Sequence, residues 1–477
     1  MTTIVWFRAD LRISDNPALV WAIARGAPVV PVFVLDDHWP DPWQPGGAAR
    51  WWLHHSLRAL DAALREYGNR LVLRCGPADR VIPELAAETD ATAVAWNRLY
   101  EGWARERDSR IKQTLKEAGI TAASFQDRVL HEPWVPKTGG GAPYKVFSPF
   151  WKALLKLGAP AEPQPAPEHI PTGPAVRGDD LDSWGLHPTR PDWSGGLHAT
   201  WTPGEAGAQA RLHAFLDGAL AQYPELRNRP DRAGTSAMSP HLRWGEISPA
   251  QLWHATQHRM MEDACHDAGM TFLRELGWRD FSYHLLYWWP DLADVTWKPA
   301  FRAFPWREDG DGYRAWARGQ TGYPIVDAGM RELYATGWMH NRVRMIVGSF
   351  LVKDLLIPWQ WGETWFWDTL VDADPATNAA SWQWVAGCGA DAAPYFRIFN
   401  PVTQGQKFDP GGAYVRRWVP EIAALPDRYL HAPWTAPASV LAHAGITLGT
   451  SYPEPLVDHK AARKRALDAF ETIKGGA

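Results

Sequence analysis

Residues 2–36 read TTIVWFRADLRISDNPALVWAIARGAPVVPVFVLD and contain two short apolar runs rich in β-branched residues, Thr3–Arg8 and Pro28–Asp36. Runs of this length and composition are typical of β-strands. Three similar runs follow in the N-terminal part of the chain, at Arg70–Cys75, Ala91–Asn97 and Ile120–Gln126. We therefore expect five strands there.

Helical patterns separate these strands. A charged stretch at residues 105–118 ends before Gly119, a common helix stop signal. Strands that alternate with helices predict an α/β domain with a doubly wound parallel sheet, in which ligands bind beyond the carboxyl ends of the strands. Between the second and third strands, a helix is indicated by apolar residues at spacings of four, three, four and three: Leu53, Leu57, Leu60, Leu64 and Tyr67.

A proline-rich segment divides the chain. Residues 158–174 read GAPAEPQPAPEHIPTGP, with six prolines and few large apolar side chains, which is typical of an extended linker. From about Glu205 the pattern becomes helical, and no internal repeat is visible. We expect an α/β domain over residues 1–130, a connector over 131–204 and an all-α domain over 205–477.

Composition excludes several classes of protein. The 477 residues carry a net charge of −4, so bulk charge cannot hold nucleic acid and any such contact needs a local basic patch. Three distant cysteines exclude a disulfide framework and a cysteine metal cluster. There is no signal-peptide pattern and no apolar run near the ~18–20 residues of a membrane span, so we expect a cytoplasmic protein without a membrane partner.

Two common phosphate-binding motifs are missing, because no GxGxxG follows the first strand and no Walker A loop is present. This argues against dinucleotide dehydrogenases and P-loop enzymes. Tryptophan is unusually frequent, with 30 residues against 16 Phe and 13 Tyr. Trp stacks on flat ligands and can carry an oxidised hole, but a tryptophan-rich core is the better explanation for most of the thirty.

Phe272–Tyr283 reads FLRELGWRDFSY, in which Glu275, Trp278, Arg279 and Ser282 follow helical spacing. A carboxylate and an indole on one helix face suit a flat ligand that needs stacking and a hydrogen-bond acceptor. An interfacial helix with a surface salt bridge explains the pattern equally well.

Residues 338–345, WMHNRVRM, place Asn341 and Met345 one turn apart, with Arg342 and Arg344 beside them. Taken alone, such a cluster is usually a solvated helix face.

Residues 372–384, DADPATNAASWQW, combine two carboxylates with an amide and two indoles. Asp372 and Asp374 lead into a helix that carries Asn378 and Trp382 one turn apart. The carboxylates either cap this helix or bind hydroxyl-bearing and heterocyclic ligands. No metal-ligand triad or nucleophile–base motif is visible, so the chemistry would belong to a bound cofactor.

Three motifs resemble the cryptochrome/photolyase family: VWFRADLRISDNPAL (5–19), TGYPIVDAGMRELYATGWMHNRVRMIVGSFLVKDLL (321–356) and DADPATNAASWQWVAGCGADAAPYFRIFNPVTQGQKFD (372–409). Two further stretches, GGAARWWLHHSLRAL (46–60) and WTPGEAGA (201–208), are most similar to the class III cyclobutane pyrimidine dimer (CPD) photolyases. The resemblance covers essentially the whole chain. It implies FAD in the helical domain.

The FAD contacts that the resemblance implies carry hydroxyl, carboxylate, amide or guanidinium groups. They are Tyr223, Thr235, Ser236, Ser239, Arg279, Asn341, Arg344, Asp372, Asp374 and Asn378. Asn378 would face the flavin N5. The family's phosphate-binding segment TSRLS reads TSAMS here, so Ala237 removes a cation, and hydroxyl and backbone N–H groups would serve the pyrophosphate.

The resemblance also implies a site for a flipped-out pyrimidine dimer. Glu275 and Asn341 would bind the thymine edges, and they form the catalytic set with Asn378. Asn341 replaces the histidine of (6–4) photoproduct enzymes, which argues against that activity. The remaining dimer contacts would be Trp278, Met345 and Trp384, and the DNA phosphate contacts Arg342, Arg397 and Lys407.

Trp382, Trp359 and Trp306 match the family's electron-transfer chain, with Trp316 as an alternative end. A second, antenna chromophore is implied, most simply 5,10-methenyltetrahydrofolate. Its site is unassigned, because Trp103 and Ala104 depart from the better-known folate pattern in YEGWARERD (100–108). Two other positions, Arg50 and Glu101, match those used by deazaflavin-binding relatives.

The implied activity is light-driven repair of pyrimidine dimers in UV-damaged DNA, by electron transfer from excited FADH⁻. A deoxyribodipyrimidine photo-lyase of this kind would be a cytoplasmic, nucleoid-associated monomer. The main alternative is a blue-light receptor that binds FAD without repair; the chain shows no long tail after the shared core, which disfavours it. A nucleotide-binding enzyme of the adenylyl-transfer type, suggested by the N-terminal sheet alone, is more distant.

Overall fold

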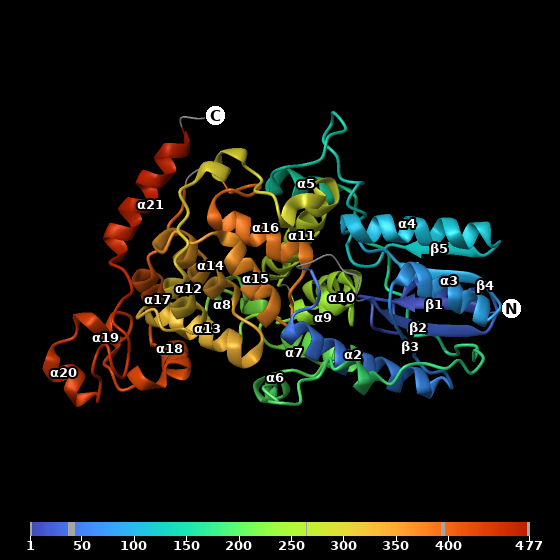
Figure 1. The fold of residues 1–477 in the computed structure, drawn as a ribbon, viewed down its shortest axis with the longest axis horizontal. Helices are drawn as coiled ribbons and strands as arrows, with labels where there is room; N and C mark the ends of the chain where they lie inside the picture. The colour runs from blue at the N-terminus through green and yellow to red at the C-terminus, as the bar shows by residue number, and fades with distance from the viewer. Residues whose placement is uncertain (1, 37–42, 264, 393–395, 475–477) are drawn as a thin grey trace. The chain divides into compact units, whose positions relative to one another are not determined.

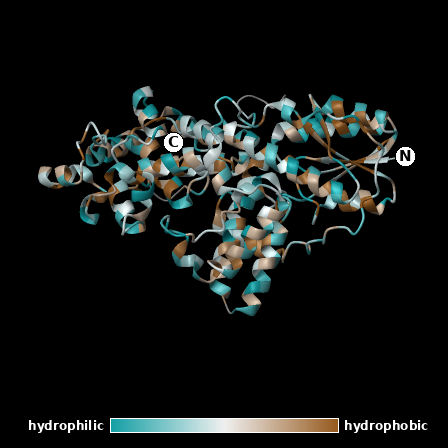
Figure 2. Cartoon of the chain, turned by 90° about the horizontal axis from the view of Figure 1, so that it is seen from below, coloured by the Kyte–Doolittle hydropathy of each residue, from teal (hydrophilic) through white to brown (hydrophobic). Residues whose placement is uncertain are grey.

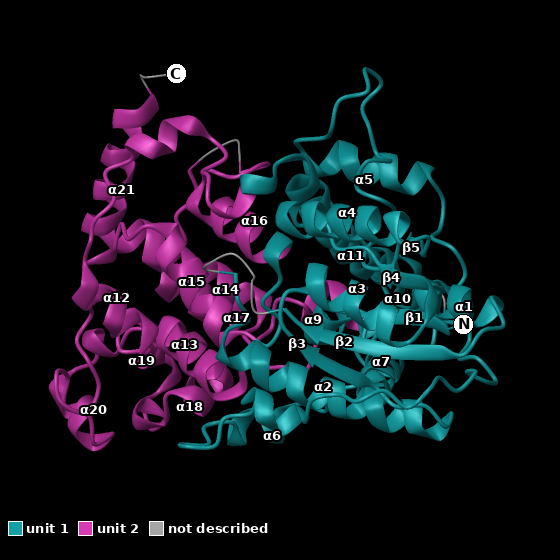
Figure 3. Ribbon diagram, turned by 45° about the vertical axis from the view of Figure 1, so that its right-hand side comes forward, with its two compact units in different colours: residues 1–221, 236–291, 371–376 teal, residues 222–235, 292–370, 377–477 magenta. Residues whose placement is uncertain are grey.

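The computed structural model describes residues 2–36, 43–263, 265–392 and 396–474. These residues form two compact units (Figure 3). Unit 1 comprises residues 1–221, 236–291 and 371–376, and unit 2 comprises residues 222–235, 292–370 and 377–477. The domain boundaries expected from the sequence remain a prediction.

Unit 1 contains a five-stranded sheet in which every neighbouring pair is parallel (Figure 1). The order β3–β2–β1–β4–β5 is that of a doubly wound sheet, as predicted. The strands are β1 (Thr2–Phe7), β2 (Val29–Leu35), β3 (Val72–Cys75), β4 (Ala91–Asn97) and β5 (Thr121–Phe125). Each lies within two residues of its predicted bounds.

Helices cover the sheet, whose strands β1, β2 and β4 are buried along almost their whole length. Figure 2 shows the hydrophobic colour of these strands. Trp6 and Trp96 on neighbouring strands meet edge to face, with ring centroids 5.9 Å apart. They belong to one buried cluster with Ile82, Leu85 and Ile111 from the helices above. The helices around the sheet are α1 (Pro17–Ala24), α2 (Gly47–Glu66), α3 (Ala78–Glu88) and α4 (Gly102–Glu117).

The proline-rich connector is extended, as predicted, and Thr172 bridges to Val29 of β2. Beyond it unit 1 is helical. Its helices after the sheet are α5 (Phe147–Lys156), α6 (Gly195–Thr200), α7 (Glu205–Asp217), α9 (Ser239–Trp244), α10 (Pro249–Glu262) and α11 (His266–Trp288).

In unit 2 the described residues are mostly helical. Its core packs α13 on α14 so closely that a Cβ at Gly329 would lie 2.4 Å from Val343. The helices are α8 (Tyr223–Leu226), α12 (Gly310–Ala317), α13 (Pro324–Thr336), α14 (Asn341–Ser349), α15 (Trp359–Thr369), α16 (Pro375–Ala386), α17 (Pro401–Phe408), α18 (Ala413–Trp418), α19 (Asp427–Leu430), α20 (Ala438–His443) and α21 (His459–Lys474). Across the described ranges of both units, no helix has the length and apolar character needed to cross a bilayer.

Candidate functional site

In unit 1 the fold brings together the serine of α9 and the acidic segment before α16. Ser239 Oγ donates a hydrogen bond of 2.5 Å to Asp372 Oδ2, although the residues are 133 positions apart. Two side chains of α9 fix the backbone of the same segment, since Arg243 donates to the Ala373 carbonyl and Trp244 to the Val371 carbonyl. Two of the predicted FAD residues therefore lie in direct contact.

Asp374 lies deeper in unit 1 and is almost fully buried. Its Oδ1 accepts from the Ala376 N–H at 3.0 Å, so it caps α16, which was one of the two readings of the sequence. Its Oδ2 forms an ion pair of 3.2 Å with Arg128 and accepts a hydrogen bond from the Tyr283 hydroxyl. Burial alone would raise the pKa of Asp374, but the surrounding guanidinium groups lower it below its ordinary value.

Three arginines supply this positive environment. Arg279, a predicted FAD contact on α11, donates to the carbonyls of Arg128 and Leu242 and lies over the Tyr283 ring. Arg128 and Arg243 are buried and were not predicted from the sequence. The sequence around Arg128 and around Arg243 shows no pattern that would distinguish a buried arginine from a surface one.

The TSAMS segment turns sharply before α9. Ala237 has a φ of +49°, in the left-handed region, and Ser236 Oγ accepts from the Met238 N–H at 3.4 Å. Ser236 belongs to unit 1, whereas the predicted FAD contacts Thr235 and Tyr223 belong to unit 2.

The predicted helical spacing is observed, since Glu275, Trp278, Arg279 and Ser282 all lie on α11. Trp278 is half-buried, and its ring lies parallel to that of Phe147 on α5, with the centroids 3.6 Å apart. Glu275 is half-buried one turn earlier. Phe147 was missed by the sequence analysis because a single phenylalanine gives no local signal of what it stacks on.

In unit 2 the second predicted segment forms the start of α14. His340 caps this helix by accepting from the Arg342 N–H at 3.1 Å, and Asn341 is exposed at its first position. Asn341 and Met345 share the helix, as expected. Arg344 is held by a 2.7 Å hydrogen bond from its Nε to the Met339 carbonyl.

Three predicted DNA-phosphate contacts also belong to unit 2. Arg397 and Lys407 are exposed, and Arg397 lies 5.7 Å from the ring of Trp384. Arg342 donates to Asn228 Oδ1 at 2.6 Å, and burial, with the charges of Arg227 and Arg397, lowers its pKa. Arg227 was not predicted. We call Arg227, Arg342, Arg397 and Lys407 the basic patch.

Asn378 and Trp382 lie against α15. Asn378 Nδ2 donates to the Glu363 carbonyl at 3.2 Å, which fixes the amide. Trp382 is buried and meets Phe366 and Trp316 edge to face, at centroid distances of 4.9 and 6.2 Å. Residues 393–395 of the third motif lie outside the described residues.

The other two tryptophans of the predicted chain have different surroundings. Trp359 is buried at the start of α15, and Trp306 is half-buried beside Phe304, at a centroid distance of 4.4 Å. Trp316, the alternative end of the predicted electron-transfer chain, is a ring neighbour of Trp382.

Comparisons with known proteins agree with these observations. Residues 3–168 match the family model described as DNA photolyase, and residues 272–472 match the FAD binding domain of DNA photolyase. The chain is 51% identical over 473 residues to the deoxyribodipyrimidine photo-lyase of Agrobacterium fabrum, covering 99% of this chain and 98% of that protein. The chain belongs to the photolyase/cryptochrome family.

Other members of the family are also similar. A crystal structure of a bacterial class III photolyase from Agrobacterium tumefaciens superposes with a TM-score of 0.96 at 50% identity, over 99% of this chain and 98% of that one. Cryptochrome-1 of Arabidopsis thaliana is 38% identical, over 99% of this chain and 70% of its own length. The class III resemblance seen in the sequence is confirmed, and so is the predicted photolyase fold.

Proposed function

We propose that this protein is a CPD photolyase, which uses light to split cyclobutane pyrimidine dimers in DNA. The observation that carries the proposal is the full-length likeness to a protein named deoxyribodipyrimidine photo-lyase. The TM-score of 0.96 to a class III photolyase supports it.

The residues of unit 1 fit FAD by the chemistry of their side chains. Ser239 and Asp372 offer a hydroxyl and a carboxylate side by side, which suits the hydroxyl groups of the cofactor. Arg279 and the buried Arg128 and Arg243 surround Asp374 with positive charge, which suits a diphosphate or an anionic flavin. Five further FAD contacts are proposed on the family resemblance alone, namely Tyr223, Thr235, Asn341, Arg344 and Asn378.

Asn378 is assigned to the flavin N5 on the family resemblance, and the orientation of its amide is compatible with this role. The hydrogen bond to the Glu363 carbonyl fixes the plane of the amide before any ligand binds. A pre-oriented polar group needs no reorganisation during the reaction.

The dimer is assigned to two groups of side chains. Glu275 and Asn341 offer hydrogen bonds to the imide and carbonyl edges of the thymines, and a buried donor left unmatched costs about 1–3 kcal/mol. Trp278, Met345 and Trp384 offer apolar contact to the flat, largely apolar bases. Extruding a dimer from the duplex costs less than extruding an intact base pair, because the damaged bases stack poorly.

When bound, reduced FAD supplies the electron that opens the cyclobutane ring after light absorption and then takes it back. The protein's own contribution is to hold the dimer, exclude water and provide the hydrogen bonds that stabilise the charge on it. The basic patch would neutralise a few phosphates beside the damage.

An antenna chromophore completes the proposal, with methenyltetrahydrofolate as the candidate and no site assigned. We place the enzyme in the cytoplasm as a monomer that associates with the nucleoid through DNA.

A repair assay tests the function. Purified protein with reduced FAD should convert dimer-containing oligonucleotides to intact thymines under blue light and not in the dark. Protein that binds FAD and leaves dimers intact under light would instead be a photoreceptor of the cryptochrome type. The absorbance spectrum of the released cofactors would identify the flavin and the antenna.

A further inference from the structure

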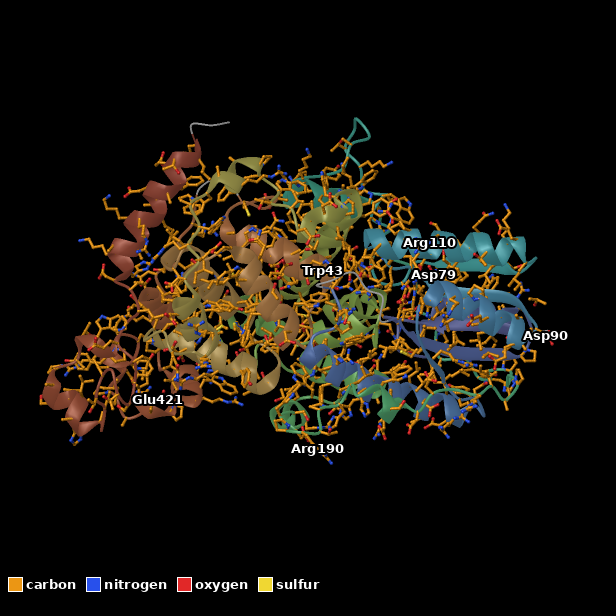
Figure 4. The ribbon with its side chains drawn as sticks, viewed as in Figure 1. Trp43, Asp79, Asp90, Arg110, Arg190 and Glu421 are labelled. Atoms are coloured by element: carbon orange, nitrogen blue, oxygen red, sulfur yellow. The ribbon has the colours of Figure 1, made fainter. Side chains whose placement is uncertain are left out.

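Three histidines to which the proposed function assigns no role meet in unit 1. His55 lies on α2, His187 lies in the loop after the 3₁₀ turn Leu181–Trp184, and His198 lies on α6. One imidazole nitrogen from each lies within 4.8 Å of the other two. Arg190, labelled in Figure 4, marks the loop between the last two. The histidines are 132 and 11 positions apart, so no spacing motif revealed them.

Two of these imidazoles have nitrogens without protein partners. His55 Nε2 and His187 Nδ1 are buried, and neither atom forms a hydrogen bond with the described residues. Metals bind neutral imidazole, and an orphaned buried nitrogen is costly unless something binds it.

Negative charge lies at the edge of the cluster. The Asp192 carboxylate is 3.8 Å from His187 Nε2, and it is held by hydrogen bonds from the Ser194 N–H and hydroxyl at 2.9 and 2.6 Å. A carboxylate beside the second nitrogen of a ligating histidine is a common arrangement in metal sites. With Nε2 turned to Asp192, Nδ1 is the nitrogen of His187 that can bind a metal.

We propose that His55, His187 and His198 form a binding site for one Zn²⁺ ion. Three imidazoles with water in the fourth position are a known tetrahedral zinc set. Zn–N bonds of about 2.0–2.1 Å require nitrogens about 3.4 Å apart, so the cluster must contract. His198 is exposed and can make this movement.

His198 Nε2 at present accepts a hydrogen bond of 3.3 Å from the Trp51 indole. The metal ion must displace this bond if it takes the same lone pair. The competing explanation is an aromatic cluster, in which the rings of His55 and His198 pack edge to face 4.8 Å apart without a metal. The site would tie the connector to α2, so metal binding would stabilise the folded chain.

The test uses full-length, tag-free protein carrying its flavin, freed of metal by a chelator and titrated with zinc chloride by calorimetry. We expect one Zn²⁺ per chain and a higher melting temperature with zinc. His198→Ala and His187→Ala should each weaken binding by at least about tenfold. His443→Ala changes an exposed histidine of α20 and serves as the matched control.

Each outcome decides the proposal. Stoichiometric binding that both ligand variants weaken and His443→Ala leaves unchanged supports it. No zinc binding by the wild type overturns it, and so does binding that survives in His198→Ala and His187→Ala with flavin absorbance showing folded protein. Calcium and magnesium should produce no binding heat, because these ions prefer oxygen ligands.

Discussion

The ring of Trp278 on α11 lies flat against that of Phe147 on α5, with the centroids 3.6 Å apart and the planes inclined by 9°. Phe147 is fully buried, whereas Trp278 is half-buried. The stack therefore fixes one face of the indole and leaves the side chain partly accessible. A tryptophan held in this way is prepared to contact a flat base without losing further conformational freedom on binding.

Replacing the stacking partner should weaken the binding of damaged DNA. Phe147→Leu keeps an apolar side chain and removes the ring. Aromatic pairs contribute about 0.5–1.5 kcal/mol, so we expect a Kd about 2- to 10-fold higher. FAD content should not change. The matched control is Phe150→Leu on the same helix, whose ring packs against Phe281. Equal losses in the two variants would contradict a specific role for the stack.

Removing the Glu275 carboxyl should lower both dimer affinity and repair yield per absorbed photon. The imide N–H groups of the bound thymine dimer lose their acceptor. The negative charge that develops on the C4 carbonyls of the dimer during repair loses a polar partner. Glu275→Gln keeps the size and a hydrogen-bonding group, so it should retain more activity than Glu275→Ala. The measurement is repair yield at saturating substrate. If Glu275→Ala keeps full yield and full FAD, the residue is only structural.

Trp382→Phe should block light-driven reduction of oxidised FAD, because phenylalanine is much harder to oxidise than tryptophan. Protein reduced chemically beforehand should still repair, since the repair cycle needs no external electron. The measurement is flavin bleaching under blue light with a reductant. Trp359→Phe and Trp316→Phe then distinguish the onward routes, because Trp316 lies 6.2 Å from the Trp382 ring. Normal photoreduction in Trp382→Phe would eliminate the proposed chain.

Stability should fall as the pH rises through the titration of Asp280. Burial raises the pKa of this carboxyl from 3.8 to about 7, although the N–H groups of Leu130 and His131 donate to it. Between these pH values the folded state holds a proton that the unfolded chain has released. The stabilising contribution is therefore complete below pH 3.8 and is lost as the pH approaches 7.

Asp280→Asn removes this titration while keeping an oxygen acceptor. The variant should lose less free energy of unfolding between pH 5 and pH 8 than the wild type, and each unit of pKa shift corresponds to about 1.4 kcal/mol. Urea unfolding followed by circular dichroism measures it. Asp267→Asn, on the same helix and fully exposed, is the control and should behave as the wild type. The same pH dependence in all three proteins would refute the argument.

Binding to dimer-containing DNA should weaken with salt, because the basic patch releases counterions from a few phosphates. Arg397→Ala and Lys407→Ala should each reduce the slope of log K against log salt by about one. Arg110→Ala is a suitable control, since this exposed arginine of α4 pairs with Asp79 on α3 (Figure 4). An affinity that does not change with salt concentration would contradict the proposed contacts between the basic patch and the DNA phosphates.

Local patterns were sufficient for the sheet and for the helices that carry the site. The hydrophobic repeat of a strand (two residues) or of a helix (3.6 residues) can be recognised within one short stretch of sequence. The predicted bounds of β4 therefore agree with the observed Ala91–Asn97 at both ends. The third motif likewise placed Asp374 before a helix start, because proline after an acidic cap is a local signal. The family followed from the same kind of information, since its motifs are contiguous stretches.

Tertiary structure alone decided which distant side chains meet. Arg128 pairs with Asp374 across 246 positions, Phe147 stacks on Trp278, and His55 meets His187 and His198. Each of these side chains, read in its own stretch of sequence, looks like any surface arginine, core phenylalanine or solitary histidine. Which side chains are buried, and which of them touch, depends on how the whole backbone packs. The cost of desolvating a charge and the gain from stacking two rings therefore arise only in the folded chain.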